Sequence, residues 1–421
     1  MKKVYLLLFS LLLILNCQQK ASQKELLQEQ LKNLGFQNIT SLAADSIFQV
    51  RLQCYIEQPL DHFQKSIKTF PQRLTISHVG YDRPVVLITE GYSMRKNYLQ
   101  ELAQMLNANQ VRMEYRYFGE SVPDTLDWKY LTIEQASEDY HRLRQLLGKI
   151  YPGPWLVTGW SKGGQTALIY YYHHPKDVQA VVAYDAPLNH SQADPRIDAF
   201  FEKVGTPDCR KRLIRFQRAV LKRKAEILPR FHWYALGKGY QFSIGEEKAL
   251  EYLVVEYPFS FWQYHKIDCS QIPEHNASAD QLLEHLRKVV AFSSYSDWAL
   301  NSPAMYQFMT QLGYHDYVHK NVRDLLKYKE HPNAAFAPQN VALDFDPRPM
   351  QKLEEWLNTK GNNIIYIYGE NDPWSATGII PTKATNAKRF VLRGGNHYTF
   401  IKSFPDSKQQ EIVQQLLQWM Y

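Results

Sequence analysis

A serine between two glycines is the residue of this sequence best placed to do covalent chemistry. Gly159-Trp160-Ser161-Lys162-Gly163 has the pattern G-x-S-x-G. It follows a short apolar run and opens a helix-like run, and in this strand–turn–helix context the serine serves as a nucleophile. Glycines on both sides suit a tight turn where neighbouring backbone segments approach closely. We therefore predict that Ser161 is a nucleophile.

A serine hydroxyl needs a base to remove its proton and an acid to orient that base. Asp372 comes shortly after the apolar run Ile364–Tyr368, and His397 comes shortly after Arg389–Leu392. In proteins that have this type of turn, the serine, the acid and the histidine follow one another in this order along the chain. We predict that His397 is the base and that Asp372 is the acid.

Other titratable residues remain open as alternatives. Glu370 is two residues from Asp372, and Asp185 follows the apolar run at 178–184, so either could be the acid. His315 and His319 have the i, i+4 spacing of metal-binding histidines on a helix, but without an acidic third ligand to complete the set a metal site there is disfavoured. The sequence predicts no metal site and no cofactor.

Negative charge that develops on the reacting carbonyl oxygen must be stabilised by backbone N–H groups. One such group should belong to Lys162, the residue after the nucleophile, and another to a loop after an earlier strand. Gly91 and Tyr92, at the end of the apolar run that begins at Pro84, are the candidates for that loop. Glu90 is unexpected beside such a site, because its charge would oppose the chemistry unless it has another role.

Short apolar runs alternate with helix-like patterns over much of the chain, which predicts a mostly parallel sheet covered by helices on both faces. Carboxyl ends of parallel strands meet at one edge of a sheet, where Ser161, Asp372 and His397 would then be collected. The predicted strands are Arg73–Val79, Pro84–Thr89, Gln110–Tyr115, Trp155–Thr158, Val178–Tyr184, Ile364–Tyr368 and Arg389–Leu392. The predicted helices around them are Ser93–Asn107, Glu134–Ile150, Lys162–His174, Met350–Thr359 and Ser407–Met420.

The alternation fails between residues 188 and 345, where the pattern is aromatic and helical. Helices are predicted there at Arg210–Ile227, Asp280–Phe292 and Pro303–Leu312. We therefore predict a sheet domain in two parts, 18–187 and 346–421, interrupted by a helical insertion at 188–345. A polar stretch, Gln18–Lys32, is predicted to be a helix or a linker.

The first 17 residues have the pattern of an export signal. Lys2 and Lys3 precede the apolar run Val4–Leu15, which is too short to remain as a membrane-spanning helix. Residues 14–17 resemble a bacterial lipoprotein box that ends at Cys17. The predicted location is periplasmic or at the cell surface, with membrane contact only through a lipid on Cys17; simple cleavage and secretion is the alternative.

Composition excludes several classes of protein. The sequence has 28 Tyr, 20 Phe and 9 Trp, far more apolar surface than a disordered chain carries. A net charge of +7 over 421 residues is too small an excess to indicate nucleic-acid binding, and no recognisable RNA or DNA module is present.

Three cysteines remain after Cys17, and Cys209 with Cys269 is the predicted disulfide pair. The alternative is that all three are small buried residues. The sequence sets no oligomeric state.

Several segments resemble known peptidase families. Tyr115–Ser121 resembles the HRYYGES signature of the lysosomal Pro-Xaa carboxypeptidase and dipeptidyl peptidase II family, and Asn371–Ser375 resembles its LDPWS motif. Tyr115 stands where that family has histidine, which favours a second resemblance. Thr89–Tyr92, Gly159–Gly164 and Gly394–His397 look like the bacterial secreted prolyl tripeptidyl aminopeptidases, the PS-10 type serine peptidases. The likeness extends over residues 55–400.

This resemblance implies an α/β-hydrolase fold with a helical cap, and release of tri- or tetrapeptides from free N-termini, often after proline. Peptides with a free N-terminus are thus the expected partners, and the resemblance gives Ser161, Asp372 and His397 the same roles. A buried carboxylate could pair with the substrate ammonium; Glu90 is the candidate, and an ion pair with Arg116 is its alternative role. A carboxylesterase or lipase with the same triad, and a binding protein on an inactive scaffold, are the competing functions.

Overall fold

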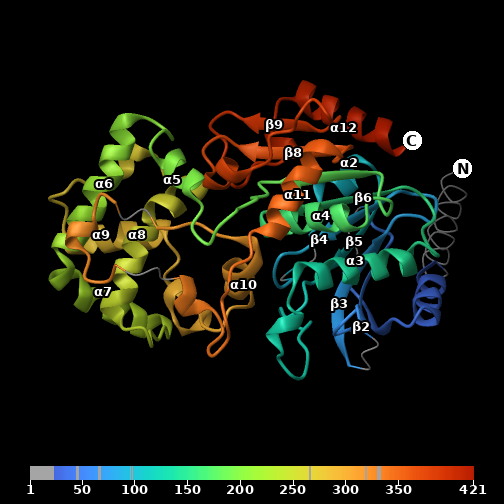
Figure 1. Ribbon diagram of the computed structural model, residues 1–421, viewed down its shortest axis with the longest axis horizontal. Coiled ribbons are helices and arrows are strands. Elements are labelled where there is room, and N and C mark those ends of the chain that lie inside the picture. The colour runs from blue at the N-terminus through green and yellow to red at the C-terminus, as the bar shows by residue number, and fades with distance from the viewer. Residues whose placement is uncertain are drawn as a thin grey trace, which may run out of the picture. The chain divides into compact units, whose positions relative to one another are not determined.

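The computed structural model describes residues 23–43, 47–64, 68–94, 96, 98–264, 267–317, 320–329 and 333–421 (Figure 1). The predicted export signal, Cys17 and His319 lie outside these residues. The chain divides into two compact units, of which unit 1 is Met1–Ala183 with Pro405–Tyr421 and unit 2 is Tyr184–Phe404. The predicted boundaries at 187/188 and 345/346 stay a prediction.

Nine strands form a mostly parallel sheet in the order β1-β2-β3-β5-β4-β6-β7-β8-β9. The pairs β5/β4, β4/β6 and β8/β9 are parallel, whereas β1, β2, β3 and β5 pair antiparallel along one side. This sheet, with helices around it, confirms the expected α/β-hydrolase fold. The strands are β1 (Gln37–Ser41), β2 (Val50–Pro59), β3 (Thr69–His78), β4 (Val85–Thr89), β5 (Asn109–Met113), β6 (Trp155–Trp160), β7 (Ala180–Tyr184), β8 (Ile364–Gly369) and β9 (Lys388–Leu392).

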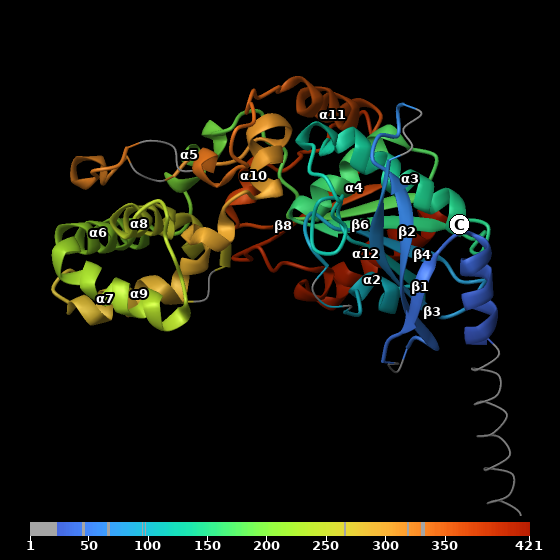
Figure 2. The ribbon, with the colours of Figure 1, turned by 90° about the horizontal axis from the view of Figure 1, so that it is seen from below.

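Helices cover both faces of the strands in unit 1. Strands β4, β5 and β7 are buried at every position, as expected for strands covered on both sides. In Figure 2, α3 and α4 lie over one face of these strands and α2 and α12 over the other. The helices of unit 1 are a segment at 23–33, α2 (Glu101–Met105), α3 (Ile133–Leu147), α4 (Lys162–His173) and α12 (Asp406–Met420).

Helix α2 is much shorter than the predicted helix Ser93–Asn107, so that prediction is wrong for its first half. Side chains from β5 and the loop after it bind the described residues of this segment, which form no helix. The Gln110 amide donates to Tyr98 O (2.8 Å) and accepts from Gln100 N (2.9 Å), and the Glu114 carboxylate accepts from Met94 N (2.8 Å). These long-range hydrogen bonds outweigh a local helical pattern.

Unit 2 carries the helices of the predicted insertion, and its described residues between β7 and β8 contain no strand. Helices α6 to α9 pack together around one buried apolar cluster (Figure 1). The predicted helix at Pro303–Leu312 is an α-helix only to Gln307 and a π-helix after it. The helices are α5 (Pro195–Phe201), α6 (Pro207–Lys222), α7 (Lys224–Lys238), α8 (Glu246–Tyr264), α9 (Ala279–Val289), α10 (Pro303–Gln307) and α11 (Arg348–Thr359).

A disulfide joins Cys209 at the start of α6 to Cys269, with the two Cα atoms 5.5 Å apart. This confirms the predicted pair, and Cys54 remains as a free, buried thiol. Within the described part of the chain, no helix is both long and apolar enough to cross a bilayer.

Candidate active site

Ser161 occupies a strained turn between β6 and α4 in unit 1. Its backbone has φ 57° and ψ −126°, a conformation that residues other than glycine rarely adopt. Such strain persists only where the surroundings enforce it, and it is concentrated at functional sites. The turn is therefore the strand–turn–helix element predicted for a nucleophile.

Both glycines of G-x-S-x-G are required by close packing. A Cβ on Gly163 would lie 2.6 Å from Thr89 O at the end of β4, and one on Gly159 would overlap the Gly163 carbonyl. The Thr89 hydroxyl also donates to Gly163 O (2.8 Å). The end of β4 thus packs directly against the turn that carries Ser161, as the parallel pairing of β4 with β6 dictates.

The loop after β4, predicted to supply an oxyanion donor, lies against the first turn of α4. A Cβ on Gly91 would be 2.6 Å from Lys162 Cβ and 2.9 Å from Gly163 N, so only glycine fits there. The first N–H groups of a helix have no partner within the helix. The structure therefore brings Gly91 and Lys162 together beside Ser161, whereas their oxyanion role stays a prediction.

The Lys162 side chain holds this loop in place. Its Nζ donates to Gly91 O (2.8 Å) and lies 3.7 Å from the ring centroid of Tyr115 and 5.6 Å from that of Tyr92. Burial lowers the pKa of Lys162 well below its usual range. The ring faces partly replace the lost hydration of the ammonium.

Glu90 forms an ion pair with Arg112 of β5, not with Arg116. Burial raises the pKa of Glu90, and the Arg112 charge acts in the opposite direction. Arg116 is itself fully buried and pairs with Asp139 (2.7 Å) of α3. Arg116 therefore ties the YRYFGES segment to α3, and Glu114, directly before that segment, pairs with Arg73 (2.7 Å) of β3. A role of Glu90 toward a substrate ammonium stays a prediction.

Asp372 and His397 meet in unit 2 because they follow neighbouring parallel strands. Gly369 at the end of β8 is paired in register with Leu392 at the end of β9. The loops after these strands place His397 Nδ1 2.7 Å from Asp372 Oδ2, with both side chains buried. This is the base–acid contact that the sequence predicts. That this pair lies beside the Ser161 hydroxyl stays a prediction.

The two alternative acids occupy different positions. Glu370 is exposed, and its carboxylate accepts from Gly394 N (2.8 Å). Asp185 is fully buried in a left-handed conformation, φ 45°, and its Oδ1 accepts from Gly369 N (3.0 Å). Asp185, Asp372 and His397 each offer an atom within 4.8 Å of the others. Burial and the neighbouring Asp372 raise the pKa of Asp185, which favours one shared proton between the two carboxyls.

The acid limb of the pH profile of kcat/KM is expected to lie below pH 6.5. His397 accepts a proton only as neutral imidazole, and burial lowers its pKa, while the Asp185 charge acts in the opposite direction. A lowered pKa keeps the imidazole neutral to lower pH, so activity is lost only below the ordinary value of 6.5. Peptide hydrolysis measured across the acid range checks this. An acid limb centred at or above 6.5 would contradict it.

The end of α8 supports the base loop, which sequence reasoning missed. Gln263 O accepts from His397 N (2.9 Å), and Tyr264 O accepts from the Asn396 side chain (2.8 Å). Trp374, two residues after Asp372, packs edge-on against Phe259 of α8 at a centroid distance of 5.0 Å. These contacts join residues more than 100 positions apart, so no local pattern reveals them.

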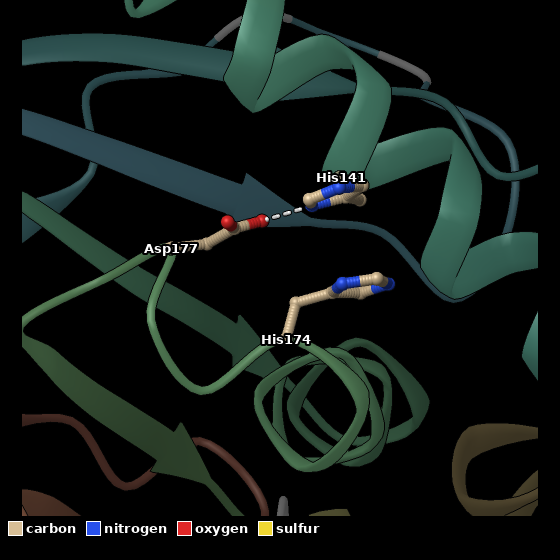
Figure 3. A group of neighbouring side chains, drawn as sticks. All are labelled: His141, His174 and Asp177. Atoms are coloured by element: carbon tan, nitrogen blue, oxygen red, sulfur yellow. Dashed lines mark hydrogen bonds and ion pairs between the residues drawn. The ribbon is translucent and has the colours of Figure 1, made fainter.

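A second cluster of possible metal ligands lies in unit 1, where His141, His174 and Asp177 lie close together (Figure 3). His141 Nδ1 is 2.7 Å from Asp177 Oδ2, and the two imidazole rings are stacked at 3.9 Å with 9° between their planes. Parallel rings cannot both direct an in-plane lone pair at one ion, so this arrangement is a hydrogen-bonded pair and not an assembled metal site. His315 belongs to no helix, so its i, i+4 spacing with His319 is not the spacing of ligands on a helix.

Comparison with known proteins identifies relatives over most of the chain. The family model of PS-10 peptidase S37 matches residues 44–420. The chain is 35% identical over 373 residues to a prolyl tri/tetrapeptidyl aminopeptidase of Streptomyces mobaraensis, covering 86% of this chain and 78% of that protein. It is 23% identical over 425 residues to human (Homo sapiens) lysosomal Pro-X carboxypeptidase, covering 83% of each. A solved proline iminopeptidase of Mycobacterium smegmatis aligns with a TM-score of 0.43 and 12% identity, over 87% of this chain and 98% of that one.

Proposed function

Since the chain belongs to the PS-10 peptidase S37 family, we propose that it is a serine exopeptidase that removes short peptides from free N-termini. The released units are tri- and tetrapeptides, and proline is favoured before the cleaved bond. Support for this substrate is the identity of 35% to a prolyl tri/tetrapeptidyl aminopeptidase. The observation that carries the proposed chemistry is the buried Asp372–His397 hydrogen bond.

In the proposed mechanism Ser161 attacks the scissile carbonyl while His397 removes the hydroxyl proton. Asp372, bonded to His397 Nδ1, holds the imidazole in the tautomer whose Nε2 is the acceptor. His397 then gives the proton to the leaving amine, and an acyl-enzyme remains on Ser161. Water repeats the sequence and releases the peptide.

Backbone donors complete the proposed site. The N–H groups of Lys162 and of Gly91 or Tyr92 stabilise the oxyanion, which is supported by the contact of the Gly91 loop with Lys162. These donors are fixed by packing before substrate binds, so no reorganisation is needed when the negative charge develops.

A set of peptide arylamides tests the proposed activity. Xaa-Xaa-Pro-arylamide with a free N-terminus should be cleaved with release of the intact tripeptide, and its N-acetylated form should be cleaved poorly. Mass spectrometry of the products gives the length of the released unit. Cleavage of short acyl esters with neither peptide cleaved would instead favour the carboxylesterase alternative.

We also propose that the protein is exported and carries a lipid on Cys17. The support is the pattern of residues 1–17, with a basic start, an apolar run and a terminal cysteine. The intact mass of the protein from the membrane fraction should equal residues 17–421 plus a diacylglyceryl group and an acyl chain. Cys17→Ser should lack that mass increment; an unmodified mass for the unaltered protein would contradict the proposal.

A further inference from the structure

Glu256 of α8 is a largely buried acid whose one ion-pair contact among the described residues is a distant histidine, His315. Its side chain is 14% exposed, and the described residues place no Lys or Arg at its carboxylate. Two other buried acids have such a partner, since Glu251 pairs with Lys224 and Asp139 pairs with Arg116. A buried charge is normally paired, so the position of Glu256 suits a cation that arrives from outside.

Only weak or uncharged donors reach the Glu256 carboxylate. Ser260 Oγ donates to Oε1 (2.9 Å), and His315 Nε2 lies 3.9 Å from Oε2. The Tyr295 hydroxyl lies 3.5 Å from Oε2 but only 3.2 Å from the Tyr317 hydroxyl, and it has a single proton to give. The carboxylate therefore retains capacity to accept hydrogen bonds from a bound group.

The helix face that carries Glu256 faces the loops of the acid and the base. Glu256, Phe259, Ser260 and Gln263 follow the i, i+3, i+4, i+7 spacing that puts residues on one side of a helix. Phe259 contacts Trp374 in the loop of the acid, and Gln263 O accepts from the backbone N–H of the base, His397. This side of α8 therefore extends, within unit 2, from the Glu256 carboxylate to the backbone of the loop that carries His397.

The spacing along this face matches a short peptide. Seven residues separate Glu256 from Gln263, which corresponds to about 10 Å along a helix axis. An extended peptide spans about 3.3–3.6 Å per residue, so three residues also cover about 10 Å. A peptide whose third carbonyl lies at His397 would thus bring its N-terminal nitrogen close to Glu256.

We propose that Glu256 binds the N-terminal ammonium of the substrate and thereby sets the length of the peptide released. This inference rests on the proposed exopeptidase function. The ammonium supplies the positive charge that Glu256 lacks, and Ser260 orients the carboxylate through its hydrogen bond to Oε1. A substrate with a blocked or longer N-terminus has no ammonium at this position. Its binding would leave the Glu256 carboxylate buried without a balancing charge.

The electrostatics of Glu256 support this role. Burial raises the pKa of Glu256 to about 8, although the hydroxyl groups of Ser260 and Tyr295 act in the opposite direction. An α-amino group has an ordinary pKa of about 7.7–8.0. Near neutral pH the Glu256 carboxyl can therefore lose its proton while the substrate amine keeps its own, at little cost in free energy. Glu90, the candidate from sequence, is already paired with Arg112.

Glu256→Gln tests the proposal through the ratio of kcat/KM for Xaa-Xaa-Pro-arylamide to that for its N-acetylated form. Glutamine keeps the shape and removes the charge, so this ratio should fall on the order of 10²-fold, mainly through the KM of the free peptide. Glu256→Asp keeps a carboxylate and should retain part of the preference for the free N-terminus. If the glutamine variant does not fold, this second variant tests the proposal through the same ratio. Equal losses for both peptides would overturn the proposal, since they indicate a structural role.

Glu90→Gln is the matched comparison, because Glu90 is the other buried acid with a candidate role toward the amine. It should not reduce the preference for the free N-terminus as Glu256→Gln does. Loss of the preference in Glu90→Gln but not in Glu256→Gln would assign the ammonium site to Glu90 and overturn the proposal. Failure of the proposed function has a different signature, because the unaltered enzyme would then cleave both peptides equally or cleave neither.

Discussion

Ser161→Ala is expected to lower kcat for Xaa-Xaa-Pro-arylamide on the order of 10⁴-fold or more. Alanine removes the only atom that can form the proposed acyl-enzyme, and members of such a triad act as a unit, so the remaining groups do little alone. Substrate contacts made elsewhere are retained, so KM should change much less. Steady-state kinetics with enough enzyme to measure slow turnover checks this result.

Ser270→Ala is a suitable control, because Ser270 is exposed and its hydroxyl donates to the exposed Asp268 (2.6 Å) in unit 2. That variant should keep nearly full turnover. If Ser161→Ala retained more than a few per cent of the activity, another residue would have to be the nucleophile.

Asp372→Asn is expected to lower kcat on the order of 10⁴-fold with little change in KM. An asparagine amide that donates to His397 Nδ1 would force the proton onto Nε2, and an imidazole in that tautomer cannot accept the serine proton. Asparagine can still accept from Trp374 N as Asp372 Oδ1 does (3.3 Å), so the loop should keep its fold. The measurement is kcat together with thermal unfolding of the variant.

Glu370→Gln is the matched comparison for this prediction. The Glu370 carboxylate is exposed and accepts a hydrogen bond from Gly394 N (2.8 Å), which a glutamine side chain can also accept. A large loss in Glu370→Gln with a small loss in Asp372→Asn would reverse the assignment of the acid. Because Asp185 lies in the same buried group as Asp372, full activity in Asp372→Asn would point to Asp185.

Local pattern was enough to predict the parts of the site that depend on a single turn or on neighbouring strands. The apolar runs before Ser161 and before Asp372 are buried strands, and Gly159 packs against Gly163 within the turn itself. The Asp372–His397 contact also followed from sequence, since parallel neighbours bring the loops after them together.

Features that depend on packing between distant segments could not be predicted in this way. The Glu90 ion pair goes to Arg112 because β4 and β5 are neighbours in register, which the sequence alone does not reveal. The described residues in the first half of the predicted helix Ser93–Asn107 are not helical because Gln110 and Glu114 bind their backbone groups. Glu256 carries no local motif, and its position becomes meaningful only when α8 is seen to contact Trp374 and His397.

Strand β2 was not predicted from the sequence, for a different reason. Its ten residues alternate strictly between buried and partly exposed positions, which is the pattern of a half-buried strand. Polar residues such as Gln53 and Gln58 weaken the apolar signal, although Gln58 is itself buried and bonded to Asp139 O (3.1 Å). Buried polar residues with a fixed partner are therefore a source of missed strands.

Mapping of a fluorophosphonate adduct tests most directly whether Ser161, His397 and Asp372 work as one relay. We expect peptide mass mapping to place the adduct on Ser161, and labelling to slow by several orders of magnitude in His397→Ala. An adduct on a different serine, or labelling of Ser161 at the same rate when the imidazole is absent, would contradict the account.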